Sequence, residues 1–201
     1  QTTNYNVSYV DGTLTITTNT TDLTVSATGY TGIYDGAFHD GVSGVTPSVT
    51  GAAISYKTGE GNYSDTMPTF KNAGTYTVTV KATLAGYTDA TKTVTVTISR
   101  AGLTITANSP TVQYNKDLPH PYTYTHSALQ TGDTLAGLSL GVVFGSTAVK
   151  GSPTGTYDIT KTAGLTQTTN YNVSYEDGTL TITTNTTDLT VSATGYTGIY
   201  D

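Results

Sequence analysis

The chain has 201 residues, with 35% hydrophobic and 11% charged residues, a formal net charge of −6 and no cysteine. The lack of cysteine excludes disulfides, thiol catalysis and Cys-ligated zinc, and the negative charge argues against partners such as nucleic acid or an anionic membrane surface. No run of about 18 apolar residues is present, so we expect no membrane insertion within this sequence.

The composition predicts an all-β protein. Tyrosine, with 16 residues, favours half-buried strands, and glycine, with 22 residues, supplies turns. No segment has a helical apolar period longer than a turn or two.

One stretch of the sequence occurs twice. Residues 1–35 recur at 167–201 with a single difference, Val10 in the first copy and Glu176 in the second. A repeat of this length at a fixed offset indicates a tandem array. We therefore expect the chain to hold one period of an array and the opening of the next.

Residues 1–18 are predicted to form a β-hairpin that closes a preceding domain. Apolar residues alternate with polar ones on both sides of an Asp11-Gly12 turn signal. These apolar residues are Tyr5, Val7, Tyr9, Leu14 and Ile16. The Val10/Glu176 exchange indicates an exposed position at the turn.

Residues 19–101 are predicted to form an Ig-like β-sandwich that follows a polar linker at 19–22. Regular alternation puts the apolar residues of 75–82 and 94–98 on one face of each strand. Further strands are expected from Leu23, at Val45–Val49 and at Ala53–Tyr56. Strands at this spacing, with turns between them, are typical of a sandwich.

Three motifs in residues 23–100 resemble the bacterial Ig-like repeats that carry a YDG signature. They are Tyr34-Asp35-Gly36, the run Asn72-Ala73-Gly74-Thr75-Tyr76-Thr77-Val78, and Ala85-Gly86-Tyr87. The resemblance implies an Ig-like fold, and the Asn-Ala-Gly-x-Tyr run resembles the corner that leads into the penultimate strand.

Residues 102–184 are predicted to form a second β domain. Strands are expected at Leu103–Ala107, from Tyr122 and Tyr124, at Leu138–Phe144 and at Gly155–Ile159, with a hairpin over Tyr171–Thr183 closing the domain. The stretch Leu129–Leu135 is too short for more than a helical turn. The periodicity is compatible with a sandwich and with a β-grasp-like sheet.

The second domain resembles the MBG domain of bacterial surface proteins and adhesins. The resemblance is carried by LTITA at 103–107, by Leu135–Leu140 after Gly132-Asp133, and by NYNVSYEDGTLTIT at 170–183. The usual Tyr-Gly-Asp turn of that family is Tyr114-Asn115-Lys116 here. By this reading residues 1–18 are the C-terminal hairpin of a preceding MBG-like domain, and residues 185–201 are the first strand of the next Ig-like domain.

No catalytic constellation or cofactor site is predicted, and we expect no enzyme. The G-x-S-x-G pattern at 137–141 lacks the following helix that a hydrolase elbow requires, because strand-like residues come next. The histidines lack the spacing of a helical metal pair. Asp22, Asp35 and Asp40 could supply oxygen ligands to a calcium ion, but without an EF-hand pattern solvated carboxylates are the better interpretation.

Three tyrosines are the candidate ligand-contact residues, namely Tyr87, Tyr122 and Tyr124. Aromatic faces stack on sugar rings, although most tyrosines here alternate along strands and are expected in the core. An intramolecular Lys–Asn isopeptide bond also stays open, with Lys81 and Lys92 near strands but at positions expected to face water.

The sequence favours a structural repeat of a bacterial extracellular stalk or fibre. Its partners would be neighbouring repeats of the same chain or identical chains, and its location the bacterial cell surface. The alternative is a repeated adhesin module that binds mucin or matrix glycans weakly and gains avidity from repetition.

Overall fold

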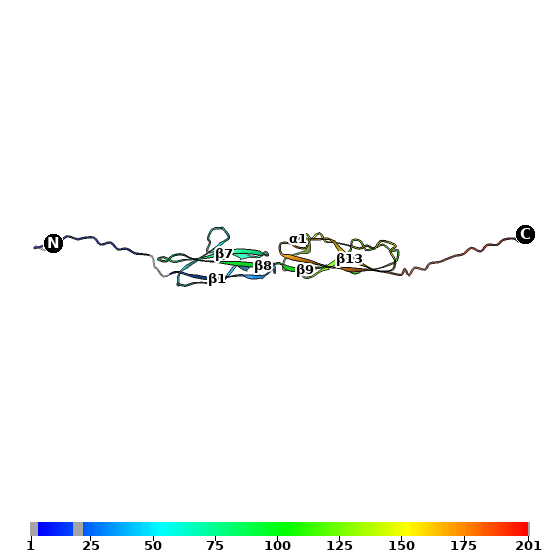
Figure 1. The fold of residues 1–201 in the computed structure, drawn as a ribbon, viewed down its shortest axis with the longest axis horizontal. Helices are drawn as coiled ribbons and strands as arrows, with labels where there is room; N and C mark the ends of the chain where they lie inside the picture. The colour runs from blue at the N-terminus through cyan, green and yellow to red at the C-terminus, as the bar shows by residue number, and fades with distance from the viewer. Residues whose placement is uncertain (1–3, 18–21, 201) are drawn as a thin grey trace. The chain divides into compact units, whose positions relative to one another are not determined.

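The computed structural model describes residues 4–17 and 22–200 (Figure 1). The chain divides into two compact units, Gln1–Ser99 and Arg100–Asp201. The described residues of both units are built from strands, with one four-residue helix, α1 (Leu135–Leu138), in the second. The predicted all-β class is confirmed.

Two facing sheets form the first unit. The smaller sheet pairs β1 with β4, and the larger has the strand order β2-β8-β7-β5; β3 and β6 form a further short pair. The strands are β1 (Val25–Gly29), β2 (Thr31–Ile33), β3 (His39–Asp40), β4 (Val42–Pro47), β5 (Ala53–Thr58), β6 (Thr69–Phe70), β7 (Gly74–Thr83) and β8 (Ala90–Ser99).

The core of the first unit lies on one face of β7 and β8, as the alternation predicts. Val78, Val80 and Ala82 of β7 are buried, and so are Val94 and Val96 of β8, while the threonines between them are exposed or half-buried. Side chains of a strand point alternately to opposite faces, so one threonine-rich face is left to solvent. Leu23 and residues of β1 and β4 cover the apolar face from the other sheet.

Two sheets also form the second unit. Of the two folds compatible with the periodicity, a sandwich and a β-grasp-like sheet, the structure has the sandwich. One sheet has the order β11-β9-β14 and the other β10-β15-β13-β12. The strands are β9 (Ala101–Ala107), β10 (Thr111–Gln113), β11 (Tyr124–His126), β12 (Val143–Gly145), β13 (Gly155–Ala163), β14 (Tyr171–Glu176) and β15 (Gly178–Thr183). The most deeply buried side chains are those of Leu103, Ile105, Ile159, Tyr171 and Leu180.

The predicted hairpin over Tyr171–Thr183 is wrong, because its two strands belong to different sheets. β14 lies parallel to β9, whereas β15 pairs with β13 and β10. Alternation in the sequence predicts which face of a strand is buried, but it does not predict which other strand pairs with it. Gly178 lacks the positive φ of a tight Asp-Gly hairpin turn. A Cβ atom at Gly178 would lie 2.6 Å from the carbonyl oxygen of Asn108, so a close backbone approach requires glycine there.

The predicted hairpin at residues 1–18 is not formed in the part that the structure describes. Residues 6–17 contain no strand, and the side chain of Leu14 is 86% exposed. The same residues in the second copy build β14 and β15, where Leu180, the counterpart of Leu14, is fully buried. Residues 1–3 and 18 lie outside the described residues.

The predicted strand at Leu138–Phe144 is also wrong over most of its length. Leu138 ends α1, Ser139 caps the helix with a left-handed φ of 49°, and the strand begins only at Val143. The hydroxyl oxygen of Thr134 accepts a 3.2 Å hydrogen bond from the backbone of Gly137, which starts the helix. Similarly, Tyr122 precedes β11, which begins at Tyr124.

The two units are joined by a single residue outside a strand. β8 ends at Ser99 and β9 begins at Ala101, so the expected boundary between residues 101 and 102 falls inside β9. The guanidinium Nε of Arg100 donates a 2.9 Å hydrogen bond to the carbonyl oxygen of Thr168 in the second unit. The connection between the last strand of the first unit and the first strand of the second is therefore one residue long.

Both units follow the same strand plan. In each, the first strand pairs with an antiparallel neighbour (β1 with β4, β9 with β11), and a short following strand lies parallel to the last one (β2 with β8, β10 with β15). The last strand then pairs with the long strand before it, β7 or β13. The second unit adds β14 to this plan.

Candidate interaction surfaces

The Tyr34-Asp35-Gly36 signature forms a structural corner after β2. Tyr34 is buried, and its backbone N–H donates a 2.8 Å hydrogen bond to the carbonyl oxygen of Ser99. Asp35 accepts a 2.9 Å hydrogen bond from the backbone N–H of Ala37, and Gly36 has a φ of 81° that favours glycine. The motif therefore turns the chain and holds it against β8.

Asp35 also binds a histidine that stacks on a tyrosine. Nε2 of His39 lies 2.9 and 3.0 Å from the two carboxylate oxygens of Asp35, and its ring stacks on Tyr30 with the centroids 4.4 Å apart. The hydrogen bond from Ala37, followed by that from His39, lowers the pKa of Asp35 below its ordinary value. Both carboxylate oxygens are thus engaged by the protein.

A calcium site at Asp22, Asp35 and Asp40 finds no support in the described part of the chain. No group of three or more His, Asp or Glu side chains that would hold a metal ion occurs there. Asp35 is bound to His39, and Asp22 and Asp40 are exposed.

The lowered pKa of Asp35 predicts an acid-sensitive contribution to the stability of the first unit. A depressed carboxyl pKa stabilises the folded state above the unfolded value of 3.8 and loses that effect as the pH falls through the folded value. We expect Asp35→Asn to flatten the loss of stability below about pH 4. Thermal unfolding of both proteins between pH 6 and pH 2.5 measures this, and an unchanged slope would contradict the assignment.

The three tyrosines named as ligand candidates do not form an exposed cluster. Tyr122 is 5% exposed, which leaves no ring face for a sugar, so its selection is wrong. Tyr87 packs partly buried against the core of the first unit. Tyr124 is half-buried, with its ring centroid 6.0 Å from that of Phe144 in the second unit. Alternation could not identify Tyr122 as buried, because it lies outside the strand.

A hydroxyl network explains the Gly132-Asp133 motif. The hydroxyl of Tyr171 donates a 2.7 Å hydrogen bond to Oδ2 of Asp133 and accepts a 2.8 Å bond from the backbone N–H of Gln130. Gly132 has a φ of 86°, which folds the turn that carries Asp133. The network ties the segment before α1 to β14.

Replacing Tyr171 with phenylalanine is expected to lower the free energy of unfolding of the second unit by about 1–2 kcal/mol. The substitution keeps the buried ring and removes the hydroxyl that bonds to Asp133 and Gln130. Tyr5→Phe is the matched control, since Tyr5 occupies the same place in the repeated sequence and is 77% exposed. Denaturant unfolding of the two variants measures the difference, and equal effects would contradict the network.

The remaining chemical motifs do not assemble a reactive site among the described residues. In the G-x-S-x-G pattern Ser139 follows a helix and precedes β12, the reverse of the order in a hydrolase elbow. Nζ of Lys81 lies 3.3 Å from Oδ2 of Asp89 and 4.9 Å from the ring centroid of Tyr63, and Lys92 is exposed. Neither lysine has the buried surroundings that an isopeptide bond requires.

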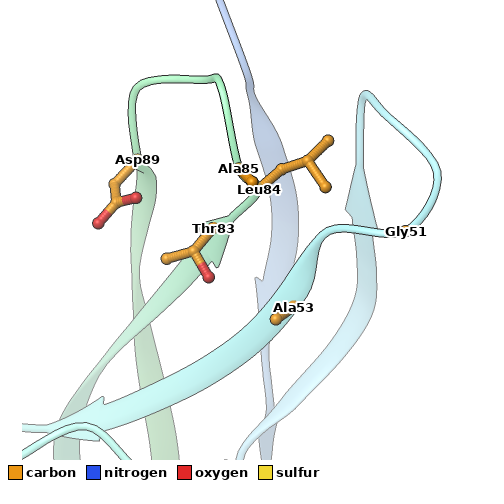
Figure 2. Close-up of a pocket in the computed structure, with 6 residues that line it drawn as sticks. All are labelled: Gly51, Ala53, Thr83, Leu84, Ala85 and Asp89. Carbon is orange, nitrogen blue, oxygen red and sulfur yellow. The ribbon is translucent and has the colours of Figure 1, made fainter. Parts of the chain in front are cut away.

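A shallow, open pocket, called the dish below, lies at the N-terminal end of the first unit (Figure 2). It has a volume of about 480 Å³ and is lined by Gly51, Ala53, Thr83, Leu84, Ala85 and Asp89. These residues come from the β4–β5 and β7–β8 connections and from the strand ends beside them. β1 begins at the same end, because the backbone N–H of Thr24 donates a 2.9 Å hydrogen bond to Oγ of Ser48, in the β4–β5 connection. The surface combines apolar side chains with the hydroxyl of Thr83 and the carboxylate of Asp89.

The C-terminal end of the second unit carries the turn after β10. Asn115 in this turn has a φ of 64°, a conformation that asparagine tolerates better than most residues and that glycine would adopt in the usual Tyr-Gly-Asp sequence. Nζ of Lys150 donates a 2.8 Å hydrogen bond to Oδ1 of Asp117, which joins the β12–β13 connection to the turn. The lysine lowers the pKa of Asp117.

Comparison with known proteins identifies the second unit. Residues 103–181 match the family model described as the MBG domain (YGX type), inside the range 102–184 that the sequence resemblance covers. No curated protein matches the chain. The MBG resemblance is thereby confirmed, and the YDG-type resemblance of residues 23–100 stays a prediction.

Among solved structures, the chain is similar to the fibronectin(III)-like modules of Clostridium thermocellum CbhA. The identity is 11%, the match covers 86% of this chain and 100% of that chain, and the TM-score is 0.25. At this TM-score the likeness adds nothing to the strand assignment. Among the described residues, no helix has the length and apolar character needed to cross a membrane.

Proposed function

We propose that the chain is a structural repeat of a bacterial extracellular stalk or fibre, without enzymatic activity. An MBG domain fits a bacterial surface or extracellular repeat module. The observation that carries the proposal is the contrast between the two copies of the repeated sequence. Tyr171 and Leu180 are fully buried in the second unit, whereas Tyr5 and Leu14 are 77% and 86% exposed.

The C-terminal copy shows the opposite arrangement. Leu23 and Tyr34 are buried in the first unit, and their counterparts Leu189 and Tyr200 are exposed. Each end of the sequence therefore repeats residues that form strands in a complete unit elsewhere in the chain, but here their apolar side chains are exposed. Continuing the sequence at its own repeat would supply the missing strands and bury these side chains.

Short connections support a stiff array. One residue separates β8 from β9, and neither this connection nor 185–188 is a flexible glycine- and serine-rich coil. With sandwich units stacked end to end, a period should extend on the order of 70–80 Å, from long strands of 7 to 10 residues and their loops. Small-angle scattering from a multi-repeat polypeptide would contradict the stalk if it gave a compact particle.

The decisive experiment uses the single difference between the copies as a mass label. We would place residues 100–166 before Gln1, which completes a second unit around residues 1–18, and measure hydrogen exchange by mass spectrometry. Peptides with Val10 should exchange fast in the 201-residue chain and slowly in this longer polypeptide. Peptides with Glu176 should be protected in both. An unprotected Val10 peptide in the longer polypeptide would overturn the proposal.

Weak binding to mucin or matrix glycans is the alternative function. None of the three named tyrosines presents a fully exposed ring, which favours the structural role. Glycan-array binding that grows with the number of repeats would favour the adhesin instead.

A further inference from the structure

The first residues after the second unit are fixed to that unit. The backbone N–H of Tyr114 donates a 2.8 Å hydrogen bond to the carbonyl oxygen of Thr183, at the end of β15. Nδ2 of Asn185 then donates to the carbonyl oxygen of Tyr114 over 3.1 Å, and Nε2 of Gln113 donates to Oγ1 of Thr186 over 3.0 Å. The chain thus leaves the second unit along the turn that follows β10.

The chain enters a first unit almost immediately afterwards. Leu189 is the repeated counterpart of Leu23, which is buried in the first unit, and Thr24 is hydrogen-bonded to Ser48. Only Thr187 and Asp188 lie between the last residue bound to one unit and the first residue buried in the next. Three Cα–Cα steps span at most about 11 Å. In a tandem array the two unit ends must therefore lie close together.

The exposed side chains of the two ends complement each other. Beside the turn after β10, Val149 is 65% exposed and Tyr114 is 42% exposed, although both are large and hydrophobic. Val149 lies at the same end as the exit of β15, because β13 begins at Gly155 opposite Ile182. The first unit offers the dish of Figure 2, which Leu84 lines together with the small residues Ala53 and Ala85.

Both ends carry charged side chains, and each end holds an ion pair of its own: Lys150 with Asp117 on the second unit, and Asp89 with Lys81 on the first. Lys116 and Lys150 border the exposed apolar pair of the second unit, and Asp89 stands at the rim of the dish. Because these ion pairs are internal to each unit, the match between the two ends rests on their apolar side chains.

We propose that the dish at the N-terminal end of the first unit receives the Tyr114 and Val149 end of a second unit that precedes it. The partner is therefore a second copy of this chain's MBG domain, and the contact stiffens the joint between repeats. The inference rests on the proposed tandem function and adds a specific docking surface to it.

The longer polypeptide with residues 100–166 before Gln1 tests this contact. It contains one dish, so exchange of residues 48–52 and 84–89 reports on that dish alone. We expect these amides to exchange more slowly than in the 201-residue chain, where no second unit precedes the dish. Val149→Asp in the added residues should restore the fast exchange, because it places a charged side chain in the apolar contact.

The matched control is Val149→Asp in the original second unit, which no complete first unit follows and which should leave the dish unchanged. If the Val10 peptide is protected but the dish exchanges as in the 201-residue chain, the docking surface is overturned and the tandem function stands. If the Val10 peptide stays unprotected, both proposals fall. A protected dish that Val149→Asp does not alter would also overturn the docking surface.

Discussion

Leu180→Ala is expected to destabilise the second unit by about 2–5 kcal/mol, while Leu14→Ala leaves both units unchanged. Leu180 is fully buried between the two sheets, so its truncation removes apolar contacts and leaves a cavity. Leu14 has the same neighbours in sequence but is 86% exposed. The two variants therefore remove the same side chain from the same local sequence, once where it is buried in a folded unit and once where it is exposed.

Denaturant unfolding of the two variants, followed separately for each unit, measures this difference. We expect two transitions in each protein, because each unit has its own core, and only the transition of the second unit should shift in Leu180→Ala. A single transition for the whole chain, or a loss in Leu14→Ala as large as in Leu180→Ala, would contradict this.

Gly29→Ala is expected to destabilise the first unit by about 3 kcal/mol, the upper end of the usual cost of overpacking. A Cβ atom at Gly29 would overlap the carbonyl oxygen of Thr95 in β8. Because this oxygen belongs to the backbone, the overlap cannot be relieved by a change of side-chain rotamer. The pairing of β1 with β4 shifts register between Ser26 and Thr28, just before this close approach.

Gly195→Ala is the control for Gly29→Ala. Gly195 occupies the same place in the repeated sequence, and a Cβ atom there meets nothing within 4 Å. Thermal unfolding should show a lowered transition of the first unit in Gly29→Ala and an unaltered curve in Gly195→Ala. Equal curves for the two variants would mean that β1 moves away from β8 at no cost.

The strands that alternate regularly could be predicted from the sequence, and the pairing of those strands could not. β7 and β8 were predicted with the correct buried faces because alternation reports directly on burial. The same alternation in residues 171–183 suggested a hairpin, since it says nothing about which sheet a strand joins. The crossing between sheets depends on the close approach of Gly178 to Asn108, which no local pattern encodes.

The candidate surfaces depended still more on tertiary structure. Tyr122 was selected as an accessible aromatic residue and is buried, whereas Tyr114 and Val149 were not selected and are exposed. The dish is built from two connections more than 30 residues apart, and it holds no residue with a chemical signature. The repeat of residues 1–35 was the one sequence signal that pointed to these ends, because it shows which surfaces an array would bring together.

The parallel pairing of β2 with β8 determines how the first unit would bear tension. A pull on the two ends of the chain draws β2 and β8 in opposite directions along their common axis. The hydrogen bonds between the two strands are then loaded in shear and must break together rather than one at a time. The backbone bonds from Thr97 to Tyr30 and from Tyr34 to Ser99, 2.9 and 2.8 Å long, extend this ladder at both ends. The second unit has the same device in β10 and β15. We therefore expect each unit to resist extension along the chain more strongly than a sandwich whose first and last strands are antiparallel.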